Sequence, residues 1–326
     1  MAIIKHTPCS EDVGAKQPNQ RVCTADPPSD GDSALQIHLV RVSKTFPAAE
    51  STQDDADRSR KSIASFLPFL EAESQQDIGR FRFLRDAQRC LIGRLSRRFM
   101  ASQRLGLPWA DVTFRTAARG RPEVQHAANA SQVLDLNVSH DTDLVAIASV
   151  AFTMQTPVRV GLDVMHIKNP WEGSSLDELI EGLAEQLSEE ELDALKEIED
   201  DQARLERILA LWTLKESFVK ATGDGLHFDL KSLQFRVTSP APSAPRTALP
   251  AGQAFLHGTA LEGWRFLLKK LRMDNSTEAS GSYWLAVATQ VPGGEGEILT
   301  GGDAERHMKV SWLTMDEILR NATHII

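Results

Sequence analysis

A glutamate and a lysine one helical turn apart continue a stripe that the sequence predicts to face inward. Apolar residues recur at helical spacing through residues 205–212, and steps of four carry this stripe on to Glu216 and then Lys220. A carboxylate on such a face could bind a cation or accept a proton, and an ammonium could bind an anion. The alternative is an ordinary Glu–Lys pair on a solvated helix surface.

Asp163 is a second carboxylate in an unexpected place, because it lies in the apolar centre of the predicted strand 158–164. A buried carboxylate without a partner is costly. This cost favours a functional role for Asp163 over the alternative, in which its side chain caps a neighbouring loop.

The elements that must position these residues form one set of strand, helix and strand before about residue 153 and another set after it, which is compatible with an α/β protein. The first long helix, 80–104, has helical periodicity and ends at a Gly/Pro break. Residues 9–33 and 47–61 are polar and lack periodicity, and 238–252 is a Pro-rich flexible insertion. Further helices are predicted at 176–195 and 201–221, and strands at 35–42, 134–138, 144–152, 158–164, 230–237, 264–271 and 283–289.

Composition fits a soluble globular protein. The chain has 326 residues and 41% hydrophobic content, enough for one large domain or two packed smaller ones. The longest mostly apolar run, 144–158, is too short to span a membrane, and the N-terminus lacks a signal-peptide pattern. We therefore expect a cytoplasmic protein without a membrane partner. Three widely spaced cysteines argue against a disulfide framework and a zinc site.

Positive charge is concentrated in one segment, although the net charge is −9. Residues 80–121 contain eleven arginines and two acids, whereas residues 172–207 contain fourteen acids and three bases. Guanidinium groups bind oxyanions bidentately, which suits a phosphate ligand or an acidic protein partner. We expect no nucleic-acid partner. The alternative is a helix with a solvated basic face.

Four segments carry a specific resemblance when they are taken together. They are Gly120-Arg121-Pro122, Asn137-Val138-Ser139-His140, Val160-Gly161-Leu162-Asp163-Val164, and the run from Trp212 to Lys220 followed by Gly223 and Gly225. In this order and at these separations they resemble the phosphopantetheinyl transferases of the large, Sfp-like class. Such enzymes move the 4′-phosphopantetheine arm of coenzyme A onto a serine of an apo acyl or peptidyl carrier protein and release adenosine 3′,5′-bisphosphate.

The resemblance implies an α/β fold of two similar subdomains related by a pseudo-twofold axis. Each would be a small sheet packed on a long helix, with coenzyme A in the cleft between them. We place the two subdomains at 34–153 and 154–326, after a mobile tail at 1–33. Because one chain supplies both halves, we expect a monomer.

The implied reaction starts with a serine hydroxyl that attacks phosphorus, so the site needs a base, a divalent cation and positive charge for the leaving group. Magnesium takes one or two protein carboxylates, and manganese is the alternative ion. Asp163 and Glu216 are the candidate metal ligands. By the resemblance, Glu216 is also the general base, directly or through water, and Lys220 stabilises the leaving charge. Lys215 would support phosphate binding, and its alternative is a surface lysine.

Further contacts to coenzyme A are implied by the same resemblance. His140 matches the family histidine that meets the 3′-phosphate, and Arg119 and Arg121 stand where basic residues contact phosphate. The full set of expected coenzyme A contacts is Thr116, Arg119, Gly120, Arg121, Asn137, Ser139, His140, Asp163, Lys215, Glu216 and Lys220.

Two positions depart from the family pattern. Met165 stands where many bacterial members have a third acidic ligand, so the metal would be held by two carboxylates, with water at the third position. Asp77 replaces a basic residue, and Arg80 or Arg82 would have to substitute for it.

Two other function classes remain possible at this point. A relative that binds coenzyme A without turnover would be expected to lack Asp163, Glu216 or Lys220, and all three are present. A nucleotide-diphosphate hydrolase would need a further acidic cluster near these residues, which the sequence does not offer. Acidic carrier domains could dock across the cleft or on the arginine-rich first half, where Arg97 and Arg98 are the positions to test.

Overall fold

The computed structural model describes residues 35–46, 61–117, 121–125, 133–153, 158–171, 173–237, 252–273 and 281–325. The predicted tail at 9–33 and nearly all of the segments 47–61 and 238–252 lie outside the described residues. The described residues contain both helices and strands, so the predicted α/β class is confirmed. Within the described ranges, no helix is long and apolar enough to cross a membrane.

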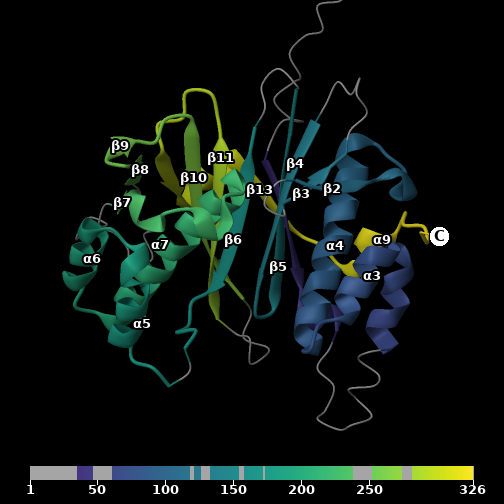
Figure 1. Cartoon of the computed structure of the whole chain (residues 1–326), viewed down its shortest axis with the longest axis horizontal. Coiled ribbons are helices and arrows are strands. Elements are labelled where there is room, and N and C mark those ends of the chain that lie inside the picture. Colours follow the sequence, from purple (N-terminus) through teal and green to yellow (C-terminus); the bar gives the residue numbers. More distant parts are fainter. Residues whose placement is uncertain are drawn as a thin grey trace, which may run out of the picture.

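A four-stranded sheet with α4 on its outer face forms the first half of the molecule (Figure 1). The strand order is β13-β1-β5-β4, in which β5 pairs antiparallel with both β1 and β4. Leu91, Ile92 and Leu95 of α4 lie in the core on this face. The bounds are β1 Leu35–Arg41, α1 Val42–Thr45, α3 Ala72–Gly79, α4 Leu84–Leu105, β2 Phe114–Thr116, β3 Pro122–Val124, β4 Val133–Asp141 and β5 Leu144–Phe152.

A seven-stranded sheet covered by α5, α6 and α7 forms the second half (Figure 1). Its order is β6-β11-β10-β12-β8-β7, with β9 paired to β8, and Leu214 and Phe218 of α7 lie in its core. The bounds are β6 Val160–His166, α5 Leu176–Leu183, α6 Glu189–Lys196, α7 Asp201–Thr222, β7 Leu233–Val237, β8 Gly252–Leu256, β9 Thr259–Ala260, β10 Trp264–Arg272, β11 Ser282–Gln290, β12 Glu297–Thr300, α8 Gly301–His307, β13 Met308–Trp312 and α9 Met315–Leu319.

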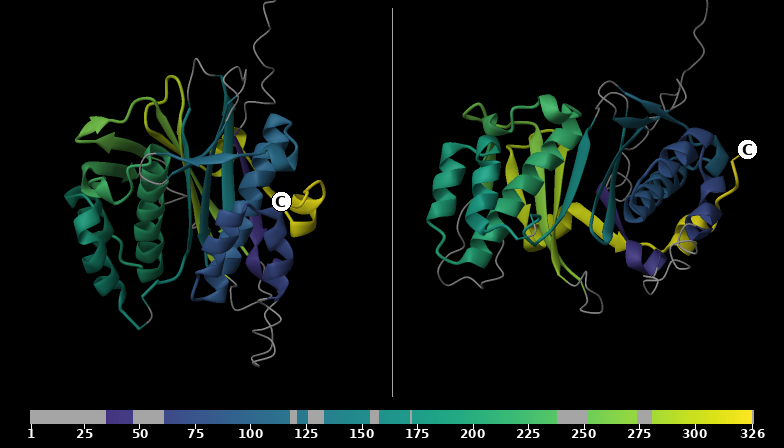
Figure 2. Two further views of the ribbon diagram at one scale, coloured as in Figure 1. Left: turned by 45° about the vertical axis from the view of Figure 1, so that its right-hand side comes forward. Right: turned by 60° about the horizontal axis from the view of Figure 1, so that its bottom comes forward.

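The two sheets pack face to face and share one hydrophobic core. Ile37 and Ala146 of the first sheet belong to the same buried cluster as Leu162 and Leu285 of the second. Because α4 and α7 cover the two outer faces, the layers run helix, sheet, sheet, helix (Figure 2). The pseudo-twofold relation between the halves stays a prediction.

The two long helices have matching lengths and ends. Both α4 and α7 span 22 residues, and each ends at a glycine in the left-handed region, Gly106 with φ 64° and Gly223 with φ 76°. Glycine adopts this conformation without a steric cost, which makes it the usual residue after a helix. The predicted long helices at 80–104 and 201–221 are therefore confirmed, with ends within a few residues of the expected ones.

Local hydrogen bonds divide the predicted helix 176–195 into α5 and α6. Ser188 and Glu191 form a capping box, in which each side chain accepts a hydrogen bond from the backbone N–H of the other. This motif starts a new helix. A 3₁₀ turn at Ala184–Gln186 separates the two.

The C-terminal segment crosses back to the first half. β13 pairs in parallel with β1, placing Met308 opposite Leu35. Met315 and Ile318 of α9 pack into the cluster that contains α4. We predicted that all of 154–326 belongs to the second half, and the strand pairing corrects this for the last segment. β1 and β13 are far apart in the sequence, so no local sequence pattern could predict that they pair.

Candidate active site

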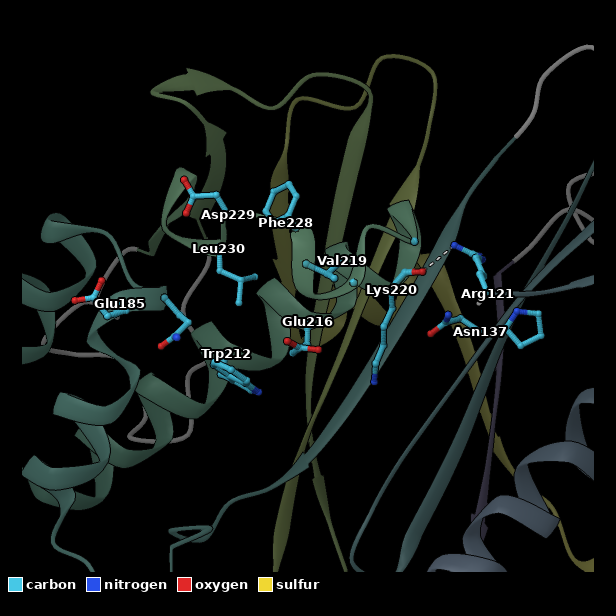
Figure 3. Close-up of a pocket in the computed structure, with 14 residues that line it drawn as sticks. Arg121, Asn137, Glu185, Trp212, Glu216, Val219, Lys220, Phe228, Asp229 and Leu230 are labelled. Atoms are coloured by element: carbon cyan, nitrogen blue, oxygen red, sulfur yellow. Dashed lines mark hydrogen bonds between the residues drawn. The ribbon is translucent and has the colours of Figure 1, made fainter. Parts of the chain in front are cut away.

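A pocket of about 610 Å³ is lined by residues from both halves (Figure 3). The first half contributes Arg121 and Asn137, and α7 contributes Trp212, Glu216 and Lys220. The other lining residues are Pro122, Glu185, Gln186, Val219, Gly223, Gly225, Phe228, Asp229 and Leu230. The pocket therefore brings together Arg121, Asn137, Glu216 and Lys220 of the predicted site.

The charged stripe of α7 faces this pocket and not the hydrophobic core. Trp212, Glu216 and Lys220 are partly buried and line the pocket. Leu214 and Ala221, on another face of the helix, are the residues packed into the core. The prediction of an inward face is confirmed for the apolar part of the stripe, Leu205 to Leu209, which packs in the core. The charged part, Glu216 and Lys220, borders a cavity where a ligand could lie.

Gly161 allows α7 to lie directly against β6. A Cβ atom at position 161 would come within 1.9 Å of the Ser217 carbonyl oxygen and 2.4 Å of the Ala221 backbone nitrogen. Any side chain larger than hydrogen would therefore push α7 away from β6. This close approach places the last turns of α7 beside Asp163, two residues further along the strand.

Lys220, Asp163 and Ser139 form one hydrogen-bonded network across the two halves. The Lys220 ammonium pairs with Asp163 Oδ1 at 2.6 Å and donates to Ser139 Oγ at 2.9 Å. Ser139 Oγ donates to the same Asp163 oxygen at 2.8 Å and accepts from the Val164 N–H at 3.2 Å. The three side chains come from β4, β6 and α7, so the network depends on all three elements.

Burial shifts both predicted metal-ligating carboxyl groups towards their neutral forms. The pKa of Asp163 is raised by burial, and the nearby Lys220 ammonium opposes that rise. Burial also raises the pKa of Glu216, the Asp163 charge raises it further, and Lys220 again opposes the rise. Among the described residues, Glu216 has no hydrogen-bond or ion-pair partner. A raised pKa makes a carboxylate a better proton acceptor.

Polar side chains of β4 join the two sheets at their edges. From Asp135 to Asp141, every second side chain of β4 accepts a hydrogen bond from a backbone N–H of β6, the edge strand of the other sheet. These bonds are Val160 N–H to Asp135 (2.7 Å), Leu162 N–H to Asn137 (3.0 Å), Val164 N–H to Ser139 (3.2 Å) and His166 N–H to Asp141 (2.6 Å). Asp135 and Asp141 were not among the predicted site residues, although the alternation of polar residues along β4 is a signal that marks them.

Lys215 lies away from the pocket, which corrects its predicted role. Its side chain is 0% exposed and its ammonium pairs with Glu191 at 2.9 Å. It also donates to the backbone carbonyls of Leu230, at 2.9 Å, and Leu233. These partners occupy the ammonium, so Lys215 is neither a phosphate contact nor a surface lysine.

Arg121 reaches the pocket, but its guanidinium is turned into the protein. It pairs with Asp135 at 2.5 Å and donates to the carbonyl oxygen of Val160 at 3.0 Å. The predicted phosphate contact at Arg121 therefore does not fit its hydrogen-bond partners.

Two further predicted contacts to coenzyme A, Thr116 and His140, are not brought into the pocket. Thr116 is exposed at the end of β2, and His140 is exposed on β4 next to Ser139. Neither residue lines the pocket. Arg119 and Gly120 lie outside the described residues.

Two of the arginines proposed for carrier docking have structural partners. Arg98 is 1% exposed and donates to the Trp109 and Val112 carbonyls. Arg97 stacks over the Phe114 ring, with 4.4 Å between its guanidinium carbon and the ring centroid. Because Arg98 is buried, charge reversal there would test folding and not carrier docking, which corrects the choice of test positions.

The position that departs from the family pattern, Asp77, is paired in the structure. Its carboxylate binds Arg80 at 3.0 Å and Arg94 at 2.9 Å. Arg80 and Arg82 are exposed. Their substitution for a basic residue at position 77 stays a prediction.

Acidic and histidine side chains do not gather in groups of three or more that could hold a metal ion in the part of the chain that the structure describes. The charge of Asp163 acts on Glu216, but the two carboxylates belong to no larger cluster among the described residues. A cation at this position would therefore need phosphate oxygens and water to complete its coordination.

Two family models match consecutive parts of the chain. Residues 57–152 match the family described as 4′-phosphopantetheinyl transferase, N-terminal, and residues 159–288 match the 4′-phosphopantetheinyl transferase superfamily. The matched ranges include all the segments on which the resemblance was based, so that resemblance is confirmed.

Individual relatives are similar over much of the chain. The L-aminoadipate-semialdehyde dehydrogenase-phosphopantetheinyl transferase of Homo sapiens is 28% identical over 226 residues, covering 69% of this chain and 68% of the relative. A 4′-phosphopantetheinyl transferase of Paxillus involutus is 29% identical over 256 residues, covering 77% and 89%. A bacterial 4′-phosphopantetheinyl transferase, from Bacillus pumilus, is 29% identical over 184 residues, covering 56% and 71%.

Proposed function

Because the chain belongs to the 4′-phosphopantetheinyl transferase superfamily, we propose that it transfers the 4′-phosphopantetheine arm of coenzyme A to a serine of apo carrier proteins. The bond between the serine oxygen and phosphorus forms as the bond to adenosine 3′,5′-bisphosphate breaks. The roles proposed below for Asp163, Glu216 and Lys220 are best supported by the contacts where β6 meets α7. There Asp163 and Lys220 pair at 2.6 Å, and Lys220 and Glu216 line the pocket.

Glu216 is the proposed general base. Its carboxyl group has no partner among the described residues, lines the pocket, and has a pKa raised by burial and by the charge of Asp163. It would take the proton of the carrier serine hydroxyl, directly or through a water molecule.

Asp163 and Glu216 are the proposed ligands of a divalent cation, magnesium or manganese. The pair fits such an ion, because Asp163 raises the pKa of Glu216 and an added positive charge would relieve the repulsion between the two carboxylates. When bound, the ion supplies positive charge to the diphosphate of coenzyme A.

Lys220 is the proposed cation for the leaving group. Its ammonium is bound to Asp163, and its side chain is 30% exposed at the pocket. Competition for Asp163 by a divalent ion would free the ammonium, which could then bind the diphosphate and stabilise the charge that develops as the bond breaks.

Both sides of the pocket come from one chain, so the proposed reaction needs no second copy. We infer a monomer that acts in the cytoplasm on acyl or peptidyl carrier domains. Magnesium dependence, the monomeric state and the cytoplasmic location are all parts of this proposal.

Intact-mass spectrometry of an apo acyl carrier protein tests the reaction. The carrier is incubated with the protein, coenzyme A and magnesium, and a second sample contains EDTA. We expect a mass gain of one phosphopantetheine group that EDTA abolishes. If acyl and peptidyl carriers gain no mass although calorimetry detects coenzyme A binding, the transferase proposal is wrong and a non-catalytic binding protein is favoured.

A further inference from the structure

The Arg121 guanidinium lies at the point where three elements of the two halves meet. One terminal nitrogen donates to the carbonyl oxygens of Lys220, at 2.8 Å, and Ala221, both in the last turn of α7. Figure 3 shows the bond to Lys220 at the rim of the pocket. The other terminal nitrogen donates to Asp135 of β4, at 2.5 Å, and to the Val160 carbonyl at the start of β6, at 3.0 Å.

These four bonds use every hydrogen on the two terminal nitrogens of Arg121. The only remaining donor is Nε, which is buried and has no hydrogen-bond partner in the part of the chain that the structure describes. The residue as a whole is 9% exposed. A phosphate group could therefore bind Arg121 only if the guanidinium gave up protein partners that hold β4, β6 and α7 together.

Two of the four acceptors of Arg121 are carbonyls that a helix end leaves without hydrogen bonds. The last four carbonyls of a helix have no partner within it, and a cation near them is favoured by the helix dipole. Gly223, the residue after α7, also lies against the Arg121 side chain, because a Cβ atom there would be 3.7 Å from Arg121 Cδ. Arg121 thus contacts the end of α7 in two ways, by hydrogen bonds to the Lys220 and Ala221 carbonyls and by packing against Gly223.

We propose that Arg121 is a positioning residue for phosphopantetheine transfer, and that its guanidinium is not a phosphate ligand of coenzyme A. It holds the last turn of α7 on β6, so that the Lys220 ammonium meets Asp163 and Ser139 in the network described above. Asp135 orients the guanidinium from the β4 side. This inference rests on the proposed function, since it concerns the same reaction and the same pocket.

The test compares Arg121→Met with the wild-type protein in two measurements. The first is the transfer rate at saturating coenzyme A, expressed per coenzyme A site. Calorimetry counts the sites, so misfolded protein that binds no coenzyme A does not lower this rate. The second is the dissociation constant for adenosine 3′,5′-bisphosphate. We expect the rate per site to fall by about 10²-fold, the order that a misplaced catalytic group costs, while the dissociation constant stays near the wild-type value.

A double substitution shows whether Arg121 acts through Lys220. Lys220→Met alone should lower the rate, and adding Arg121→Met should lower it little further, because the misplaced group is already absent.

Arg306→Met is the matched control, since Arg306 is an exposed arginine of α8 paired with Asp303, and it should leave both measurements unchanged. Arg121→Lys is the second variant if the methionine protein does not fold, because one ammonium cannot serve four acceptors, and it should also lower the rate.

Two outcomes would overturn the inference. One is a large rise in the dissociation constant for adenosine 3′,5′-bisphosphate with an unchanged rate per site, which would make Arg121 a phosphate contact. The other is that the losses from Arg121→Met and Lys220→Met multiply, which would mean that Arg121 does not act through Lys220. A wild-type protein that modifies no carrier would defeat the proposed function itself, before any variant is compared.

Discussion

Three charged side chains of α7, at positions 215, 216 and 220, have three different environments. Lys215 is enclosed in the core with Glu191, and Lys220 is held by Asp163 at the pocket. Glu216 lies in the pocket with no partner among the described residues. Neighbouring residues on a helix point in different directions, so adjacent charges can serve structure and chemistry separately.

Replacing Glu216 with glutamine should remove both of its proposed roles without changing the shape of the side chain. We expect Glu216→Gln to lower transfer by about 10²-fold or more, the usual contribution of a general base. Carrier mass spectrometry measures the rate, and circular dichroism checks the fold. Near-normal transfer by a folded variant would show that Glu216 is neither base nor essential metal ligand.

Lys215→Met should destabilise the protein and leave coenzyme A binding unchanged. Glu191 would remain buried without its cation, which costs about 3–5 kcal/mol in comparable buried pairs. Urea unfolding measures this loss, and Lys196→Met is the exposed control, which should stay within about 0.5 kcal/mol of the wild type. Adding Glu191→Gln should recover part of the loss. Wild-type stability with weaker coenzyme A binding would restore the phosphate role that we predicted from the sequence.

At the scale of elements, the site depends on how closely β6 approaches its two neighbours. On one side, alternate polar side chains of β4 accept hydrogen bonds from the β6 backbone, as Asn137 does from Leu162 at 3.0 Å. On the other side, Gly161 lets α7 lie against the strand. Asp163 is therefore placed between Ser139 and Lys220 by contacts that involve backbone atoms on both sides.

Gly161→Ala should impair both folding and transfer. The added methyl group would overlap the Ser217 carbonyl, so α7 would have to shift, at a cost of about 1–3 kcal/mol or more for such overpacking. Thermal unfolding and the transfer rate are the measurements. Gly79→Ala at the end of α3 is the matched control, because nothing lies within 4 Å of an added Cβ atom there. If both variants behave like the wild type, the close packing of α7 on β6 does not constrain the site.

At the scale of the whole molecule, the two halves are joined by a shared hydrophobic core. One buried cluster contains residues of both sheets, such as Ala148 and Val287. β13 carries the C-terminal end of the chain into the first sheet, beside β1. A pocket at the junction of the halves is therefore built on a shared core and not on a mobile boundary between separate domains.

We accordingly expect a single cooperative unfolding transition, although two family models match the two halves separately. Differential scanning calorimetry checks this by comparing the calorimetric and van't Hoff enthalpies, which are equal when no intermediate is populated. Two resolved transitions would mean that the shared cluster does not couple the halves.

The sequence by itself determined the features that depend on local spacing. Helical periodicity predicted α4 and α7, and the apolar setting of Asp163 together with the four-residue steps to Glu216 and Lys220 identified the three charged groups of the site. The order of the motifs was sufficient for the family. Each of these depends on residues a few positions apart or on a known pattern, so no contact had to be known in advance.

Only the tertiary structure decided what distant residues do to one another. Lys215 and Arg121 are both basic residues in the motifs that carry the resemblance, and their sequence context predicted phosphate contacts. Their acceptors, Glu191 and Asp135, are brought to them by packing that local patterns do not encode, as is the β1 partner of β13. A charge in a sequence has no fixed role, because its free energy depends on which opposite charges and carbonyls the fold places beside it.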